Sequence, residues 1–294
     1  MKSSFTVMQV LLMLIGLVLT VQTHAQKKND SPYFKVTDIR YSDKSKNSNH
    51  TSLDIYMPRK GSNSPVVVWI HGGVWSFGDK SDVENKPEFF TSNGYVFVSV
   101  NHRLSPEARF PDHARDVADA LAWIVKNIVH YSGDASKIFL VGYASGAHLA
   151  AFVTINENLL REAGVPPKSL RGVVLLDGIG LDIPVVMTDA TNKVRDWCIS
   201  TFGDSEQDWI DASPVSYVRS GISLPPYLIL YSGTKSPVEK EALSISRKLT
   251  DAGLKNKVIN YPKKNNLSLN KELGREGDVV GQDILYFFYE NLRN

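Results

Sequence analysis

The sequence has a single cysteine, and no histidine follows position 148. Cys198 is the only cysteine among 294 residues, so no disulfide can form within the chain and core packing must stabilise the fold. We expect the Cys198 thiol to be a small, partly buried side chain rather than a nucleophile. All seven histidines lie at or before position 148, so no residue after it can act as an imidazole base, however the chain folds.

Long runs of one charge sign are absent as well. The 33 basic and 31 acidic residues leave a formal net charge of +2, which gives no electrostatic reason to expect a nucleic acid or an anionic membrane as a partner. The sequence shows no metal-ligand spacing and no phosphate-binding loop. We therefore expect neither a metal nor a cofactor.

The first 25 residues have the pattern of a secretory signal peptide. Lys2 supplies a positive charge, residues 8–21 are almost wholly apolar, and small residues surround Ala25. An uncleaved anchor is the alternative, but the apolar run is shorter than the roughly 20 residues of a membrane span. We expect cleavage near Ala25, a mature domain of residues 26–294, export to the periplasm or the medium, and no membrane attachment after cleavage.

The rest of the chain predicts one α/β domain. Alternating apolar and polar residues at 34–39 and 51–56 are typical of antiparallel strands. Parallel strands buried on both faces are indicated by continuous apolar runs at 66–70, 95–100, 138–141, 173–176 and 227–231. Further segments complete the alternation: helices at 112–129, 238–252 and 281–292, and a strand at 257–261. We expect a mostly parallel twisted sheet with helices on both faces, and a small cap or lid at residues 178–214 over its carboxyl edge.

One turn carries a damaged motif. Residues 140–148 (Leu-Val-Gly-Tyr-Ala-Ser-Gly-Ala-His) end an apolar strand and open a helix. With Gly142 and Gly146 four positions apart, the turn resembles the G-x-S-x-G nucleophile elbow of the α/β-hydrolase superfamily. The central position is Ala144, which has no oxygen to attack a carbonyl, and the serine follows one residue later at Ser145.

A second motif strengthens the resemblance. Residues 71–75, His-Gly-Gly-Val-Trp, are similar to the H-G-G-G-W motif of the hormone-sensitive-lipase-like and acetyl-xylan or feruloyl-type carboxylesterases. Residues 101–106 resemble their N-Y-R-L-S-P segment, and residues 112–117 resemble the helix that precedes their elbow strand. The resemblance covers the chain from about residue 51 and implies an α/β-hydrolase fold. It also implies an oxyanion hole formed by the backbone of Gly72, Gly73 and Ser145.

The same resemblance implies where a catalytic triad would stand. Nucleophile, acid and histidine follow in that order along such chains. The acid position falls at Ser236, within Gly-Thr-Lys-Ser-Pro, and the histidine position falls at Asn266. With Ala144, all three positions are substituted, which implies a degenerate triad.

Two functions are compatible with these residues. The favoured one is an exported, catalytically inactive member of the carboxylesterase family that keeps its oxyanion loop and a ligand pocket, with Trp75 and Tyr143 among the lining residues. The alternative is an active carboxylic-ester hydrolase with an unusual nucleophile such as Ser145, for which His148 is the candidate base. The resemblance implies a small ester or an acylated sugar as ligand. Asp177 is interpreted as a loop residue and not as an acid with a catalytic partner.

Overall fold

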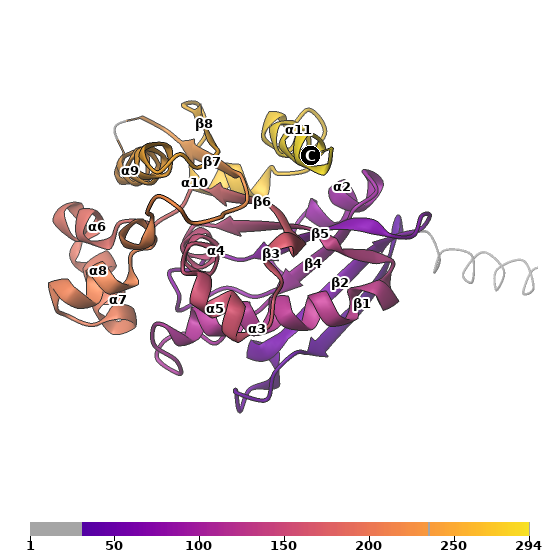
Figure 1. Ribbon diagram of the computed structural model, residues 1–294, viewed down its shortest axis with the longest axis horizontal. Coiled ribbons are helices and arrows are strands. Elements are labelled where there is room, and N and C mark those ends of the chain that lie inside the picture. Colours follow the sequence, from indigo (N-terminus) through magenta and orange to yellow (C-terminus); the bar gives the residue numbers. More distant parts are fainter. Residues whose placement is uncertain (1–30, 235, 294) are drawn as a thin grey trace, which may run out of the picture.

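The computed structural model describes residues 31–234 and 236–293, and the predicted signal peptide lies outside them. Its centre is a sheet with the strand order β1-β2-β4-β3-β5-β6-β7-β8 (Figure 1). β2 pairs antiparallel with β1 and β4, and all other neighbours are parallel, as the sequence predicts. The strands are β1 Tyr33–Arg40, β2 Ser52–Pro58, β3 Ser64–Ile70, β4 Val96–Val100, β5 Gly133–Tyr143, β6 Leu170–Leu176, β7 Tyr227–Ser232 and β8 Asn256–Tyr261.

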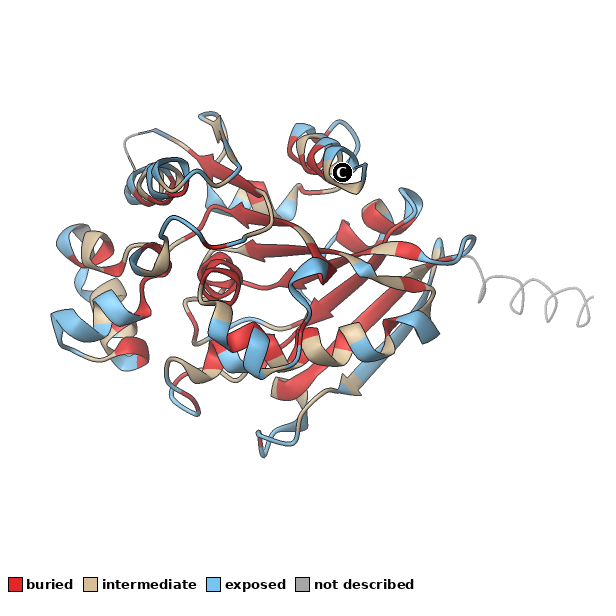
Figure 2. Ribbon diagram, viewed as in Figure 1, coloured by how far each residue is buried: buried red, intermediate tan, exposed pale blue. Residues whose placement is uncertain are grey.

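The strands differ in how deeply they are buried. The central strands are buried along nearly their whole length because helices cover both faces of the sheet (Figure 2). β1 forms where alternation predicts it but lies at the edge, and its Phe34 side chain is 51% exposed. Phe34 contacts the Arg59 guanidinium, which lies 4.9 Å from the ring centre. β1 is therefore a true strand that is mostly exposed, with Tyr33 and Ile39 packed against the margins of the core.

Helices form a layer on each face of the sheet. One hydrophobic cluster packs α3, α4, α5 and α9 against one face, and a second packs α2, α10 and α11 against the other. The three predicted helices correspond to α3, α9 and α11, with ends shifted by at most a few residues. The helices outside the predicted cap are α2 Lys86–Ser92, α3 Asp112–Asn127, α4 Ser145–Ile155, α5 Glu157–Glu162, α9 Pro237–Asp251, α10 Asn266–Lys271 and α11 Val279–Leu292, with 3-10 turns at Ser48–Thr51, Ile128–Tyr131, Pro167–Ser169 and Pro214–Tyr217.

The segment predicted as a cap folds into three short helices, α6 Ile183–Asp189, α7 Asn192–Phe202 and α8 Glu206–Ala212. They lie together beside α4 and α9 at one end of the molecule (Figure 1). They are short, and their starts are marked locally: α6 has proline in its first turn, and side chains cap the starts of α7 and α8. Thr191 accepts from the backbone of α7, and Ser205 forms a reciprocal capping box with Asp208.

The single thiol lies inside this end of the molecule. Cys198 of α7 is fully buried, more deeply than the sequence suggested, and burial raises the pKa of its thiol to about 12. A thiol that stays protonated is a poor nucleophile, as predicted. Among the described residues, no helix combines the length and apolarity needed to cross a bilayer.

Candidate active site

The turn between β5 and α4 keeps the backbone of a nucleophile elbow. Ala144 stands between the last residue of β5 and the first residue of α4, with φ 50° and ψ −116°. Its N–H donates to the Leu176 carbonyl at 2.9 Å, which ties the turn to β6. Positive φ at a non-glycine residue is strained, and such strain is concentrated at functional sites. The elbow therefore persists as backbone geometry although its central side chain is a methyl group.

Close backbone contacts explain both elbow glycines. A Cβ atom on Gly142 would lie 2.2 Å from the Gly146 carbonyl oxygen. A Cβ atom on Gly146 would lie 2.3 Å from the carbonyl oxygen of Ile70, at the end of β3. Both distances are far inside van der Waals contact, so only glycine allows α4 to start this close to the sheet.

The elbow and the predicted oxyanion loop meet at one cavity of about 350 Å³. A Cβ atom on Gly72 would lie 3.1 Å from the Ala144 methyl carbon, so these two positions face each other. Gly73 has φ 123°, and a Cβ there would overlap the Phe77 carbonyl oxygen at 2.1 Å. The cavity is lined by Trp69, His71, Gly72, Gly73, Val74, Gly78, Asp82, Tyr143, Ala144, Asn266, Leu267 and Asn270.

Asn266 lies at this cavity, as its predicted correspondence to the lost histidine requires. It is the first residue of α10. Its Nδ2 donates to Asp177 Oδ2 at 2.8 Å, and its Oδ1 accepts from the Tyr143 hydroxyl at 2.5 Å. An amide does not take up a proton near neutral pH. Asn266 therefore links β5 to the end of β6 without supplying a base.

Asp177 is the site residue that the sequence interpretation missed. It follows β6 directly, is 1% exposed and has φ 51°. Besides Asn266, the backbone N–H of Ser232 donates to its carboxylate at 2.8 Å and the Ser232 hydroxyl at 3.1 Å. Three donors thus satisfy a buried carboxylate. The only signal for it in the sequence is an acid placed directly after a buried strand.

Ser236 does not approach Asn266 in the same way. Its hydroxyl accepts from the Glu239 N–H at 3.2 Å and caps the N-terminus of α9. The Ser-Pro-Val-Glu sequence, with proline at the first helical position, is a recognisable start of a helix. The carboxylate that contacts the Asn266 side chain is that of Asp177, after β6, whereas the predicted acid position after β7 holds the capping Ser236.

The Ser145–His148 pair considered from the sequence is not formed. His148 is fully buried, its Nδ1 accepts from the Trp75 indole N–H at 3.1 Å, and its Nε2 donates to the Ala212 carbonyl at 2.9 Å. Burial lowers the pKa of His148 to about 4. Ser145 is 1% exposed, and the described residues that line the cavity do not include it. Its predicted backbone contribution to an oxyanion hole stays a prediction.

Trp75 lies in the core and does not line the cavity, contrary to the prediction. It is 1% exposed, and its ring packs edge-on against Phe202 of α7, with 4.7 Å between ring centres. A buried indole N–H needs an acceptor, which His148 supplies. Positive φ at Val74 and Trp75 accompanies this inward turn. Tyr143 does line the cavity, as predicted.

His71 is the histidine among the described lining residues. Its Nδ1 lies 2.8 Å from the Gly72 carbonyl and donates to it, and its ring stacks on His102 with 4.7 Å between centres. Its Nε2 is buried from solvent and has no hydrogen-bond partner in the described chain. Burial lowers the pKa of His71. His71 therefore lines the cavity with its Nδ1 bonded to Gly72 and its Nε2 enclosed by the chain.

Buried Lys86 joins two walls of the cavity. Its Nζ lies 4.8 Å from the Trp69 ring centre and donates to the Asn270 carbonyl at 3.0 Å and to Glu84 at 2.8 Å. The ion pair and the aromatic face offset the desolvation of a fully buried ammonium, although burial still lowers the pKa of Lys86. The lysine thereby fixes α10, and with it Asn266, against β3.

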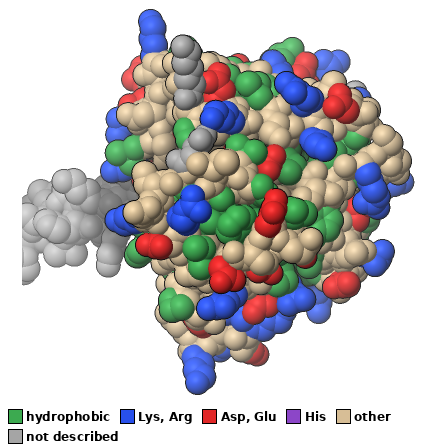
Figure 3. Space-filling view, turned by 90° about the vertical axis from the view of Figure 1, so that its left-hand side faces the viewer, with side chains coloured by type: hydrophobic (Ala, Val, Ile, Leu, Met, Phe, Trp, Pro, Cys, Tyr) green, Lys and Arg blue, Asp and Glu red, His purple; other side chains and the backbone are tan. Residues whose placement is uncertain are grey.

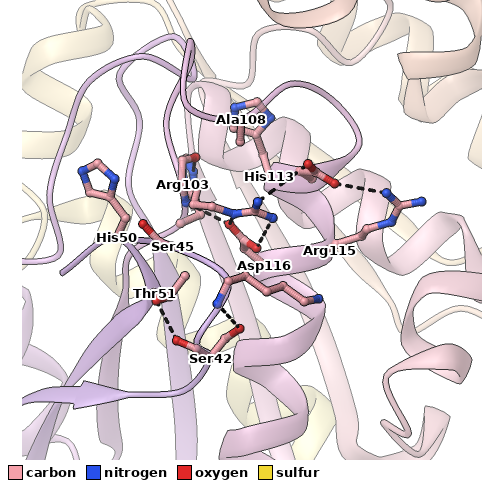
Figure 4. Close-up of polar contacts among 12 residues, drawn as sticks. Ser42, Ser45, His50, Thr51, Arg103, Ala108, His113, Arg115 and Asp116 are labelled. Carbon is pink, nitrogen blue, oxygen red and sulfur yellow. Dashed lines mark hydrogen bonds and ion pairs between the residues drawn. The ribbon is translucent and has the colours of Figure 1, made fainter. Parts of the chain in front are cut away.

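Two of the family-like segments, 101–106 and 112–117, meet through Arg103 and Asp116 (Figure 4). Arg103, from the segment 101–106, forms a fork with buried Asp116 of α3, with two side-chain contacts of 2.8 Å. The Arg103 N–H adds a third contact at 3.0 Å. In the same segment, the Ser105 N–H donates to the Trp75 carbonyl at 2.8 Å. These segments therefore support the loop and do not enter the cavity.

Comparison with known proteins identifies the family. The BD-FAE family model matches residues 53–246, which is more than half of the chain. The chain belongs to the BD-FAE family of carboxylesterase-like α/β-hydrolases. This BD-FAE protein is similar to esterase LipQ of Mycobacterium tuberculosis, with 30% identity over 210 residues that cover 66% of the chain and 47% of LipQ. Carboxylesterase NlhH of the same organism is 27% identical over 212 residues, covering 68% of the chain and 65% of NlhH. The chain spans about half or less of the length of the first curated relatives it matches.

Solved structures confirm the fold of this BD-FAE protein. Esterase B from Lactobacillus rhamnosis superposes with a TM-score of 0.75 at 19% identity, covering 96% of this chain and 95% of that one. A truncated carbohydrate esterase from gut microbiota gives a TM-score of 0.76 at 20% identity, covering 90% and 99%. At these identities the likeness establishes the α/β-hydrolase fold alone.

Proposed function

We propose that this BD-FAE protein is exported and has no esterase turnover, and that it uses its oxyanion loop and cavity to bind a small ester or an acylated sugar. The observation that carries the proposal is the contrast at one cavity between an intact, strained elbow at Ala144 and an amide at Asn266. The scaffold for ester recognition is present, whereas the groups that perform the chemistry are absent.

The chemistry explains why turnover is not expected. A serine hydroxyl attacks an ester only when a neighbouring base takes its proton. Ala144 has no hydroxyl, and the two histidines nearest the elbow, His71 and His148, have no ring nitrogen open to the cavity.

Turnover is tested with p-nitrophenyl acetate and with a fluorophosphonate probe. We expect hydrolysis near the protein-free background and no labelled band. The matched control is S145A, which should behave as the parent chain does. Turnover and labelling that are both lost in S145A would overturn the proposal and establish the alternative hydrolase.

Binding is tested separately with peracetylated methyl glucoside, followed through the backbone amide signals of Gly72 and Gly73. Ala144→Leu extends the side chain that faces Gly72 and should abolish the signal changes. Ala252→Leu, at the C-terminal cap of α9, is a matched control that should leave them intact. No change in the parent chain would contradict the acylated-sugar ligand.

Export is tested by expressing the full chain in a bacterium and weighing the protein from the periplasm and the medium. A mass that corresponds to a chain starting at Gln26 is the expected result. Recovery of the full-length chain in the cytoplasm alone would contradict export.

A further inference from the structure

We infer that Asp177 is the acid of this site. Its carboxylate contacts the side chain at position 266, where the base of a triad would stand, so only the nucleophile and the base are missing. The predicted acid position at Ser236 then needs no repair. The inference rests on the proposed function in one respect, since it takes the present chain to lack turnover.

Strand register places Asp177 next to the elbow. Tyr143 and Leu176 are paired neighbours at the ends of β5 and β6, so Ala144 and Asp177 are the next residues along adjacent strands. The Ala144 N–H donates to Leu176, and the Ile179 N–H donates back to Ala144 at 3.3 Å. The acid and the nucleophile position are thus fixed relative to each other by backbone contacts.

The amide at position 266 already forms the contact that an imidazole would form. In asparagine Nδ2 is bonded to Cγ, and in histidine Nδ1 is bonded to Cγ as well. The contact from Asn266 Nδ2 to Asp177 Oδ2 at 2.8 Å therefore occupies the place of an imidazole Nδ1–H bonded to a triad acid. The imidazole Nε2, which has no counterpart in asparagine, would extend beyond the amide as the basic atom.

The orientation of Asp177 does not depend on Asn266. Ser232 holds both carboxylate oxygens through its N–H and its hydroxyl. The loop after Asp177 is anchored by fully buried Glu241, whose Oε2 accepts from the Asp182 N–H at 3.1 Å. A side chain introduced at position 266 thus meets a carboxylate that is already in place.

The restored reaction would follow balanced chemistry in the variant A144S/N266H. The introduced imidazole takes the hydroxyl proton as the serine oxygen bonds to the ester carbonyl carbon, and it returns that proton to the departing alkoxide as the ester C–O bond breaks. Water then attacks the acyl-serine bond in the same way and releases the carboxylic acid. Asp177 stays ionised and acts as a positioning residue, by orienting the imidazole and stabilising its charge.

The first test uses N266H alone and needs no activity. Titration of the introduced imidazole by NMR should give a pKa at least about one unit higher than in N266H/D177N, because a carboxylate in contact favours the charged ring. Adding Y143F shows whether the tyrosine hydroxyl, which now binds Asn266, disturbs the new ring. Equal pKa values with and without Asp177 would overturn the inference.

The second test measures p-nitrophenyl acetate hydrolysis and fluorophosphonate labelling in A144S/N266H. We expect turnover at least about 100-fold above the parent chain, a return to the level of the parent chain on adding D177N, and little gain on adding S236D. Turnover that requires S236D, or that survives D177N, would contradict the assignment.

The two proposals fail separately. Turnover by the unmodified chain would contradict the proposed function. The titration of N266H would then still test whether Asp177 contacts the introduced imidazole. If the parent chain shows no turnover and the imidazole pKa in N266H does not depend on Asp177, the proposed function stands and this inference is wrong. Circular dichroism of each variant confirms that the comparison is made between folded proteins.

Discussion

The elbow after β5 and the loop after β8 face the same cavity, yet they retain different things. The elbow has the backbone of a nucleophile turn, with Gly142, Gly146 and the strained Ala144, but its central side chain is a methyl group. The loop after β8 carries α10 and places Asn266 in a side-chain network with Tyr143 and Asp177. The two sides of the cavity therefore differ in kind: backbone geometry defines the elbow, and a side-chain network defines the position of Asn266.

Figure 3 shows the end of the molecule that carries α6–α9, with hydrophobic side chains grouped among charged ones.

The largest effect should come from breaking the elbow. Gly146→Ala forces a Cβ to within 2.3 Å of the Ile70 carbonyl oxygen and should lower the free energy of unfolding by at least about 3 kcal/mol, measured by urea denaturation. Gly164→Ala is the comparison variant, since Gly164 has φ 78° but open space around a new Cβ, so its loss measures backbone strain without a clash. Gly146 lies in α4 and is not at positive φ, so a loss in Gly146→Ala no larger than that in Gly164→Ala would show that the contact with β3 matters less than expected.

The elbow helix should also make the protein sensitive to acid. The folded-state pKa of His148 is about 4, below the value near 6.5 of an unfolded histidine, so the unfolded chain binds the proton first as pH falls. Stability should be fully present above pH 6.5 and fall by roughly 3 kcal/mol between pH 6.5 and 4 from this group alone. Urea denaturation across that range should show a shallower slope in H148Q and an unchanged slope in H130Q, whose parent side chain is exposed.

A smaller loss is expected on the other side of the cavity. Asn266→Ala removes the contacts to Tyr143 and Asp177 but leaves Ser232 to satisfy the carboxylate, so unfolding should become easier by about 1 kcal/mol. A double-mutant cycle with Asp177→Asn measures the coupling between the two side chains. An additive cycle would mean that the 2.8 Å contact contributes nothing to stability.

The smallest effect is expected for Ala144→Ser. The elbow already holds a non-glycine residue at this φ, and the change adds one oxygen at the cavity, so stability should stay within about 0.5 kcal/mol. Esterase turnover should remain at the level of the parent chain because no base is present. A gain in turnover from this substitution alone would reveal a base that the geometry does not show.

The sequence predicts the fold well because its signals are local. Runs such as 66–70 and 138–141 form strands buried on both faces, and the glycine pair at 142 and 146 marks a turn that only glycine can make. The absence of any histidine after position 148 is likewise evident from the sequence alone.

What the sequence does not predict depends on contacts between distant segments. Asp177 and Asn266 are 89 positions apart, and nothing near either residue announces the other. Trp75 looks like a pocket residue from its place in the oxyanion motif, but its indole N–H is paired with His148, 73 positions away. The local sequence Ser-Pro-Val-Glu indicates the capping role of Ser236, but the resemblance to a catalytic motif assigns the same residue to the acid position.

The contact between Asn266 and Asp177 has a consequence for heredity. Alanine codons become serine codons by one change at their first base, GCN to UCN, and asparagine codons become histidine codons by AAY to CAY. A gene encoding this chain therefore stands two point mutations from A144S/N266H, the variant in which the proposed acid, Asp177, would meet both a hydroxyl and an imidazole.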